Sequence, residues 1–126
     1  MQQRSPNSLL AEYDAATLAR DLVDVGVDKK ASDVTLIEIG KVTTLADYFV
    51  ICTGTSDRQI NAIARAVEVA SSDAGVRLLH REGMPADGWV LLDYGQIIVH
   101  IFSPEQRAYY DLERRWEEAP TLLRIQ

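Results

Sequence analysis

Between Asp47 and Gln59 the sequence has the pattern of a buried strand, followed by a glycine turn and the capped start of a helix. Residues Tyr48–Thr53 are aromatic or β-branched apart from one cysteine, which is the composition of a strand covered on both faces. Gly54 lets the backbone turn, and Ser56 with Gln59 three positions later is the signature of a capping box. The segment predicts a central strand that leads directly into a helix, and therefore an α/β fold.

The chain has the length of a single domain. With 126 residues, of which 47% are hydrophobic, it can bury one core. No repeat or internal linker divides the sequence. We expect an N-terminal extension over residues 1–8, one domain over residues 9–117 and a C-terminal tail over residues 118–126.

The hydrophobic periodicity predicts three helices and five strands. Apolar residues at helical intervals predict a first helix over Leu9–Val27, and the capped helix is expected to run from Asp57 to Ala74. A last helix has Ser103 as its N-cap and Pro104 at its first position. Its inner face is expected to carry Tyr109, Leu112 and Trp116. The strands are expected at Asp33–Ile39, Tyr48–Thr53, Val76–His80, Trp89–Tyr94 and Gln96–Phe102. The order α-β-β-α-β-β-β-α predicts an α/β fold with helices flanking a mixed five-stranded sheet.

The last two predicted strands are close enough in sequence to form a hairpin, and both of their sides are apolar. Strand residues alternate between faces, yet Trp89 and Leu91 on one side and Val90 and Leu92 on the other are all hydrophobic. Three helices leave part of such a sheet uncovered, so we expect some apolar surface to be open to another protein chain.

The charge balance narrows the range of partners. A net charge of −6 and a pI near 4.8 disfavour a surface that grips phosphate backbones, so we expect no direct binding to nucleic acid. No signal peptide and no apolar run of about 18 residues occurs, so we expect a cytoplasmic protein with no membrane partner. Cys52 lies inside an apolar strand and is interpreted as a small buried hydrophobe.

The sequence gives little support for a metal site or for a hydrolase active site. The histidines are His80 and His100 and the one thiol is Cys52, so no zinc signature is present. Ser56, His100 and Asp93 supply the residue types of a catalytic triad, but no nucleophile-elbow sequence surrounds Ser56. We therefore expect no metal site and no hydrolase activity.

A strand, a glycine turn and a helix N-terminus also begin many phosphate sites. Nucleotidyl transfer at Gly54–Ser56 would require two carboxylates that share metal ions. Asp111 and Glu113 are two positions apart on a predicted helix, where side chains point about 200° apart. We therefore expect no cofactor and no enzyme activity. The structural helix caps are then Ser56, Gln59 and Ser103.

Residues 82–95 allow two interpretations. Trp89 follows a loop at the start of a strand, where a large ring can be half exposed, and Asp93 and Tyr94 lie at the hairpin tip. In one interpretation Trp89 is a core residue and Asp93 forms the turn. In the other both belong to an interface, because Trp, Tyr and Met beside acidic residues are typical of protein contacts.

Six motifs in the same order resemble the ribosomal silencing factor family, also called RsfS or Iojap-like. They cover about residues 10–117, and the chain departs from the family pattern at Arg115, where an aliphatic residue is usual. The motifs are Asp47–Ile51, Thr53–Gln59, Glu82–Gly83 followed by Trp89, Leu92–Gly95, Val99–Phe102, and Tyr110–Glu113 followed by Trp116.

The resemblance implies a non-enzymatic translation regulator whose fold is nucleotidyltransferase-like without the catalytic carboxylates. It implies binding to the large ribosomal subunit through its protein universal L-fourteen, on the face that meets the small subunit. This binding would block subunit association and lower translation when nutrients or energy are scarce. The resemblance also implies a homodimer off the ribosome. By position, the partner contacts fall on Trp89, Leu91, Leu92, Asp93 and Tyr94.

Two alternatives stay open. Organellar relatives of the family serve in large-subunit assembly, and an assembly factor would use the same docking surface. The other alternative is a nucleotide-binding enzyme with its site at Gly54–Arg58.

Overall fold

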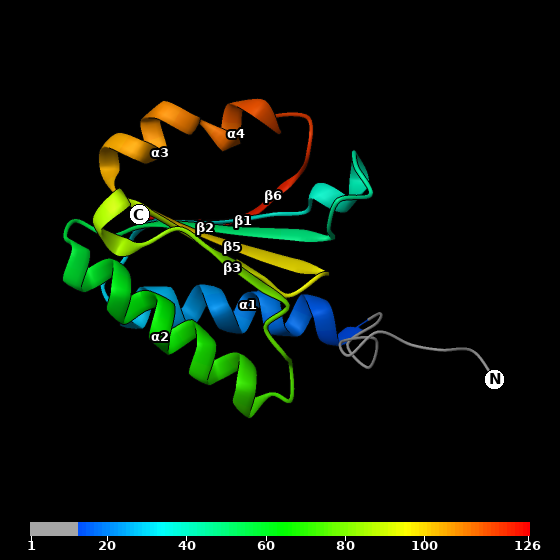
Figure 1. The fold of residues 1–126 in the computed structure, drawn as a ribbon. Coiled ribbons are helices and arrows are strands. Elements are labelled where there is room, and N and C mark those ends of the chain that lie inside the picture. The colour runs from blue at the N-terminus through cyan, green and yellow to red at the C-terminus, as the bar shows by residue number, and fades with distance from the viewer. Residues whose placement is uncertain (1–12) are drawn as a thin grey trace.

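The centre of the fold is one mixed sheet (Figure 1). In this computed structural model, which describes residues 13–126, the strands are β1 (Ser32–Ile37), β2 (Tyr48–Thr53), β3 (His80–Glu82), β4 (Trp89–Asp93), β5 (Ile97–Phe102) and β6 (Thr121–Ile125). They lie in the order β3-β4-β5-β2-β1-β6. Strands β2 and β5 run parallel, and the other neighbours are antiparallel. The predicted mixed α/β fold and the β4–β5 hairpin are confirmed.

Helices cover both faces of the sheet (Figure 1). Helices α1 (Tyr13–Asp28) and α2 (Asp57–Asp73) lie on one face, and α3 (Pro104–Tyr110) and α4 (Leu112–Arg115) lie on the other. Two short 3-10 helices, η2 (Ile39–Lys41) and η3 (Pro85–Asp87), occur in the connections. Within residues 13–126, no helix is long and apolar enough to cross a membrane.

The strand, turn and helix at residues 47–59 form as predicted. Ser56 Oγ accepts from the backbone N–H of Gln59 at 3.1 Å, which caps α2. Gln59 Oε1 accepts from the backbone N–H of Thr55 at 2.7 Å, so the reciprocal bond of the capping box reaches one residue further back than expected. Gln59 Nε2 also donates to the carbonyls of Lys29 and Lys30, and so ties the start of α2 to the end of α1.

The first core cluster lies between the sheet and α1 and α2. It contains strand residues such as Val50, Val99 and Ile101, and helix residues such as Leu22 and Ile63. Cys52 belongs to this cluster, and burial raises the pKa of its thiol to about 12. The expectation that Cys52 is a buried hydrophobe is confirmed.

The second core cluster lies between the sheet and α3 and α4. Phe49, Ile51 and Phe102 belong to it, and Trp116 packs against it from the segment just after α4. His100 is 5% exposed on the same face, with its ring edge-on to Phe49 at a centroid distance of 4.6 Å. Burial lowers the pKa of His100 to about 3, so the imidazole is neutral in the folded protein.

The expected C-terminal tail contains a sixth strand. Strand β6 pairs with β1 in antiparallel orientation, which makes the sheet six-stranded and corrects the prediction of five. It is an edge strand, and a register shift between Leu36 and Ile37 of β1 interrupts its pairing. Its residues are half-buried or exposed and lack a regular alternation, so the sequence pattern does not indicate a strand.

Strands β3 and β1 differ from their predicted bounds. Val76–His80 was expected to be a strand, but β3 begins only at His80. Val76 is buried against the first core cluster, so its apolar character reflects core packing and not sheet pairing. Strand β1 ends at Ile37, because Ile39 opens η2. The predicted helix start at Leu9 and the extension over residues 1–8 lie outside the described residues.

The last helix is broken into α3 and α4. Asp111, between them, has the left-handed dihedrals φ 49° and ψ 53°. The break changes the direction in which side chains point, so Leu112 and Trp116 pack inward while Tyr109 is 78% exposed. The expectation that Tyr109 faces inward is wrong.

The connection from β3 to β4 depends on Gly83. Its φ is +82°, and a Cβ there would lie 2.1 Å from the backbone oxygen of Trp89. Gly75, after α2, has a similar φ of +80° but no heavy atom within 4 Å of the same added Cβ. The two glycines therefore separate the cost of a left-handed backbone from the cost of a steric clash.

We predict that Gly83→Ala destabilises the protein far more than Gly75→Ala. Gly75→Ala should cost about 1–2 kcal/mol for the left-handed conformation alone. Gly83→Ala should cost more than about 3 kcal/mol, because the start of β4 must move. Urea unfolding of both variants measures the two free energies. Equal losses would show that the chain at Gly83 has room for a methyl group.

We also predict that His100→Gln flattens the pH dependence of stability between pH 5 and 6.5. The folded-state pKa of about 3 lies below the ordinary value of 6.5, so the unfolded chain takes up a proton in this window and the folded chain does not. The stability is fully present above pH 6.5 and falls as the pH drops toward 3, by about 1.4 kcal/mol per pH unit for this group.

Urea unfolding at several pH values measures this slope, with the exposed His80→Gln as the matched control. A wild-type slope in His100→Gln would show that the buried imidazole is protonated in the folded protein.

Candidate functional site

Strand β4 presents its side chains to both faces of the sheet. Trp89 and Leu91 are half-buried beside the second core cluster, and alternation places Asp93 on the same side. Leu92 and Tyr94 belong to the first core cluster and are 0% and 1% exposed. The structure thus divides the five expected contact residues, and Leu92 and Tyr94 offer a partner no exposed surface.

The ring of Trp89 is held by neighbouring aromatic rings. It stacks on Phe102 at a centroid distance of 5.9 Å and packs at 5.0 Å against Tyr110 of α3. Trp89 Nε1 donates to His100 Nδ1 at 3.3 Å. This hydrogen bond requires Nδ1 to be unprotonated, in agreement with the lowered pKa of His100. The neutral imidazole fixes the orientation of Trp89.

An exposed aromatic surface adjoins this ring. Tyr110 is 42% exposed and Tyr109 78% exposed, with an edge-to-face contact of 5.1 Å between their rings. We name Trp89, Leu91, Tyr109 and Tyr110 the aromatic face. The exposure of the two tyrosines was not predicted from the sequence, because the predicted helix continued through Asp111. Half-buried and exposed aromatic side chains in one patch have the composition of a protein interface.

Asp93 has a structural role at the hairpin tip. Its Oδ1 accepts from the backbone N–H of Gly95 at 2.7 Å, so the interpretation of Asp93 as a turn former is confirmed. An asparagine could make the same bond, since it retains the acceptor oxygen. The turn therefore requires the oxygen of Asp93 but not its negative charge.

The residues of the hypothetical triad are not brought together. Ser56 caps α2, beyond the end of β2, whereas Asp93 lies at the far end of β4 from Trp89, which pairs with the last residue of β5. His100 is neutral, and its Nδ1 is engaged by Trp89. The arrangement provides no proton relay from a serine to a carboxylate.

A small cavity of about 300 Å³ lies beside the Gly54–Ser56 turn. Its lining includes the carboxylates Asp57, Asp87 and Glu105 but no Lys, Arg or His. Acidic walls repel phosphate groups, so the cavity is poorly suited to a nucleotide. Within residues 13–126, no group of three or more His, Cys, Asp and Glu is placed to hold a metal ion.

Two further candidate residues, Ser103 and Glu113, make hydrogen bonds within the fold. Ser103 Oγ accepts from the backbone N–H of Gln106 at 3.2 Å and so caps α3 as expected. Glu113 was considered as half of a carboxylate pair, but its Oε2 is bound by Arg107 at 2.6 Å.

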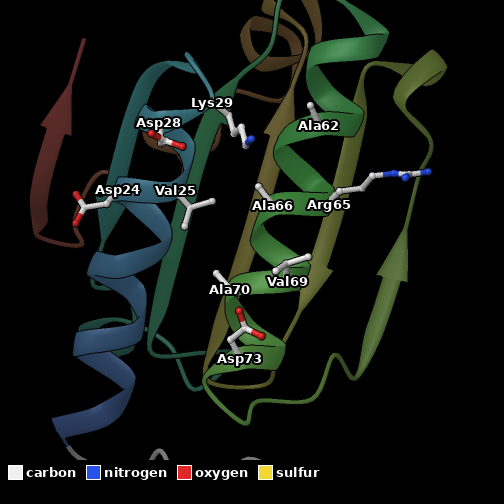
Figure 2. A pocket seen from close by; sticks show the side chains of 10 residues that line it. All are labelled: Asp24, Val25, Asp28, Lys29, Ala62, Arg65, Ala66, Val69, Ala70 and Asp73. Carbon is white, nitrogen blue, oxygen red and sulfur yellow. The ribbon is translucent and has the colours of Figure 1, made fainter.

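A groove of about 830 Å³ runs between α1 and α2 (Figure 2). Its apolar lining is Val25, Ala62, Ala66, Val69 and Ala70, and its charged lining is Asp24, Asp28, Lys29, Arg65 and Asp73. The side chain of Arg65 extends away from α1, and that of Asp24 extends away from α2 (Figure 2). The mixed charges favour no particular class of ligand, and the groove lies on the opposite side of the sheet from the aromatic face.

Arg107 is a buried arginine that the sequence analysis did not identify. It is 8% exposed, and its Nε and Nη2 both donate to Glu113 Oε2, at 3.0 and 2.6 Å. Nη1 donates to Thr53 Oγ1 at 3.0 Å and to the carbonyl of Asp33, and Nη2 donates to Thr35 Oγ1 at 3.1 Å. All five guanidinium donors are thereby engaged. The sequence signal was weak: a threonine within β1 and another at the end of the mostly apolar β2.

Comparisons with known proteins agree with this architecture. The chain matches the family described as "Ribosomal silencing factor during starvation" over residues 12–126. It is 40% identical over 93 residues to the ribosomal silencing factor RsfS of Bacillus subtilis, a match that covers 74% of this chain and 79% of the relative.

A solved structure and a more distant relative extend the comparison. A crystal structure of a protein from Chromobacterium violaceum has a TM-score of 0.73 and 35% identity, and the match covers 82% of this chain and 84% of that one. The mouse protein named "Mitochondrial assembly of ribosomal large subunit protein 1" is 33% identical over 101 residues, which are 75% of this chain and 43% of the relative. The family match over all described residues, with the identity to the Bacillus subtilis protein, shows that this chain belongs to the ribosomal silencing factor family.

Proposed function

We propose that this protein binds the large ribosomal subunit through its protein universal L-fourteen and thereby blocks association with the small subunit. Translation would fall under nutrient or energy limitation, and the protein would act in the cytoplasm without catalysis. The observation that carries the proposal is the aromatic face, an exposed apolar patch on a protein of the ribosomal silencing factor family. A protein that acts by occupying a surface needs such a patch and no reaction centre.

The contact set is refined by the two-faced geometry of β4. Trp89 and Leu91 fill an apolar pocket on the ribosomal protein, and Tyr109 and Tyr110 extend the same contact. Leu92 and Tyr94 support the contact indirectly, because they lie on the opposite side of β4 and anchor the strand in the first core cluster. Large rings at the centre of an interface contribute most of its binding energy.

Electrostatics support a basic protein as the partner. The chain carries a net charge of −6, which disfavours bare ribosomal RNA and favours a positively charged protein surface. Asp93 pairs with a Lys or Arg of the partner. Its turn role and its pairing role are separable, because only the pairing role needs the negative charge.

We predict that Trp89→Ala weakens binding to purified large subunits by about 2 kcal/mol or more, which is about 30-fold. The variant removes the central ring of the aromatic face while Leu92 and Tyr94 continue to anchor the strand. Co-sedimentation with large subunits measures the affinity, and addition of small subunits measures how many joined ribosomes form. Wild type should reduce joining, and Trp89→Ala should restore it.

Two further variants sharpen this experiment. Asp93→Asn keeps the oxygen that Gly95 needs and removes only the charge, so it should weaken binding and make it less sensitive to salt. Leu45→Ala, at a 57% exposed site away from the aromatic face, is the control and should bind like wild type. Unchanged binding by folded Trp89→Ala would refute this contact surface.

Large-subunit assembly is the second candidate function, favoured by the name of the mouse relative. An assembly factor would use the same docking surface but act before translation begins. The joining assay separates the two functions. If the wild type binds mature large subunits without reducing joining, assembly is the better description.

We also propose a homodimer in the absence of ribosomes. The aromatic face exposes apolar area that a second copy can cover. Light scattering at micromolar concentration should give twice the chain mass of 14.1 kDa. A monomer under these conditions would contradict the dimer without affecting the ribosome proposal.

A further inference from the structure

We propose that Arg107 is a positioning residue for the aromatic face: its buried guanidinium fixes the bend between α3 and α4 and thereby holds Tyr110 against Trp89. The ribosome-binding part of this inference rests on the proposed function. The geometric part concerns the free protein and stands independently of it.

The bend needs an external constraint. Asp111 adopts left-handed dihedrals without being glycine, a conformation that L-residues disfavour. Helix α3 has seven residues and α4 has four, so neither is stable on its own. The side chains of Arg107 and Glu113, one on each side of Asp111, are joined by two hydrogen bonds. This pair closes the bend.

The same guanidinium anchors the bend to the sheet. Arg107 donates to Thr53 at the end of β2, and to Thr35 and the carbonyl of Asp33 in β1. These contacts fix the rotation of α3 about its own axis as well as its distance from the sheet. A lysine could not replace them, because it has three donors and no planar fork.

Tyr110 depends on this rotation. It lies one helical turn after Arg107, and its ring packs at 5.0 Å from Trp89 and at 5.9 Å from Phe102. The side chain of Arg107 therefore fixes α3 above β1 and β2, while that of Tyr110 packs above β4 and β5. A rolled α3 would separate Tyr110 from Trp89 and widen the aromatic face.

Asp33 adds a second support to the cluster. Its carboxylate lies 3.7 Å from Arg107 Nη2 and accepts from Arg124 of β6, from Nε at 2.9 Å and from Nη2 at 3.2 Å. Asp33 is itself left-handed, with φ 49°. Two strained non-glycine residues thus meet at one arginine, as expected where a local geometry is held for a purpose.

The experiment uses Trp89 as its own reporter. The chain has two tryptophans, so a Trp116→Phe background leaves Trp89 alone. In this background Arg107→Met removes the donors while keeping an apolar stem, and Glu113→Gln loosens the bend but leaves Arg107 in place. Arg114→Met, on the exposed side of α4, is the matched control. Acrylamide quenching of Trp89 fluorescence then reports how well Tyr110 covers the ring.

We predict that Arg107→Met raises the quenching constant of Trp89 about twofold or more and weakens large-subunit binding about tenfold. Glu113→Gln should change both in the same direction by less, and Arg114→Met should change neither. In a Tyr110→Ala background, Arg107→Met should add little to either effect, because the coupling passes through Tyr110. A general loss of stability would not disappear in that background.

The outcomes separate this inference from the proposed function. If the wild type fails to bind large subunits, the proposed function fails, while the quenching series still decides the role of Arg107. Unchanged quenching in Arg107→Met and Glu113→Gln overturns the inference even where binding is intact. Should Arg107→Met not fold, Glu113→Gln with its Tyr110→Ala cycle decides alone.

Discussion

The guanidinium of Arg107 joins more of the chain than any other polar group described above. It belongs to α3 and bonds directly to β1 and β2. It is also linked to β6, because the carboxylate of Asp33 lies near Arg107 and accepts a hydrogen bond from Arg124. Burying a charge is expensive, and a buried ion pair adds little net stability compared with apolar packing. Its value lies in specificity, because a cationic fork with five engaged donors admits one arrangement of its neighbours. The sheet face beneath α3 and α4 depends on this arrangement.

The two faces of the sheet have different roles as a result. The face under α1 and α2 is sealed by two long helices and closed further by Gln59, which ties them together. The opposite face is covered by two short helices that leave Trp89 and Leu91 only half-buried. An interface requires apolar groups that are both accessible and rigid, and the aromatic face on this second side supplies them.

Local chemistry made part of this structure predictable. The capping box at Ser56, the hairpin around Gly95 and the α/β order each follow from residues close together in sequence. Strand alternation likewise predicts that Leu92 and Trp89 lie on opposite sides of β4, as the structure shows. The bend at Asp111 and the strand β6 could not be predicted, because each is stabilised by a distant partner. Arg107, beside the bend, bonds to residues 54 and 72 positions away, and β6 pairs with β1 at the other end of the chain. A helical arginine in a sequence is ordinarily solvated, and burial becomes evident only in three dimensions.

Buried residues therefore determine the geometry of the aromatic face. Strand β5 serves both cores, with Val99 and Ile101 on one side and His100 and Phe102 on the other. The neutral His100 accepts the hydrogen bond that orients Trp89, and Phe102 stacks on the same ring. Changes at these buried positions would alter recognition by turning the ring, with little change in exposed area. In the proposed function, recognition would depend on the orientation of Trp89 as much as on exposed apolar area, because buried residues hold the ring in place.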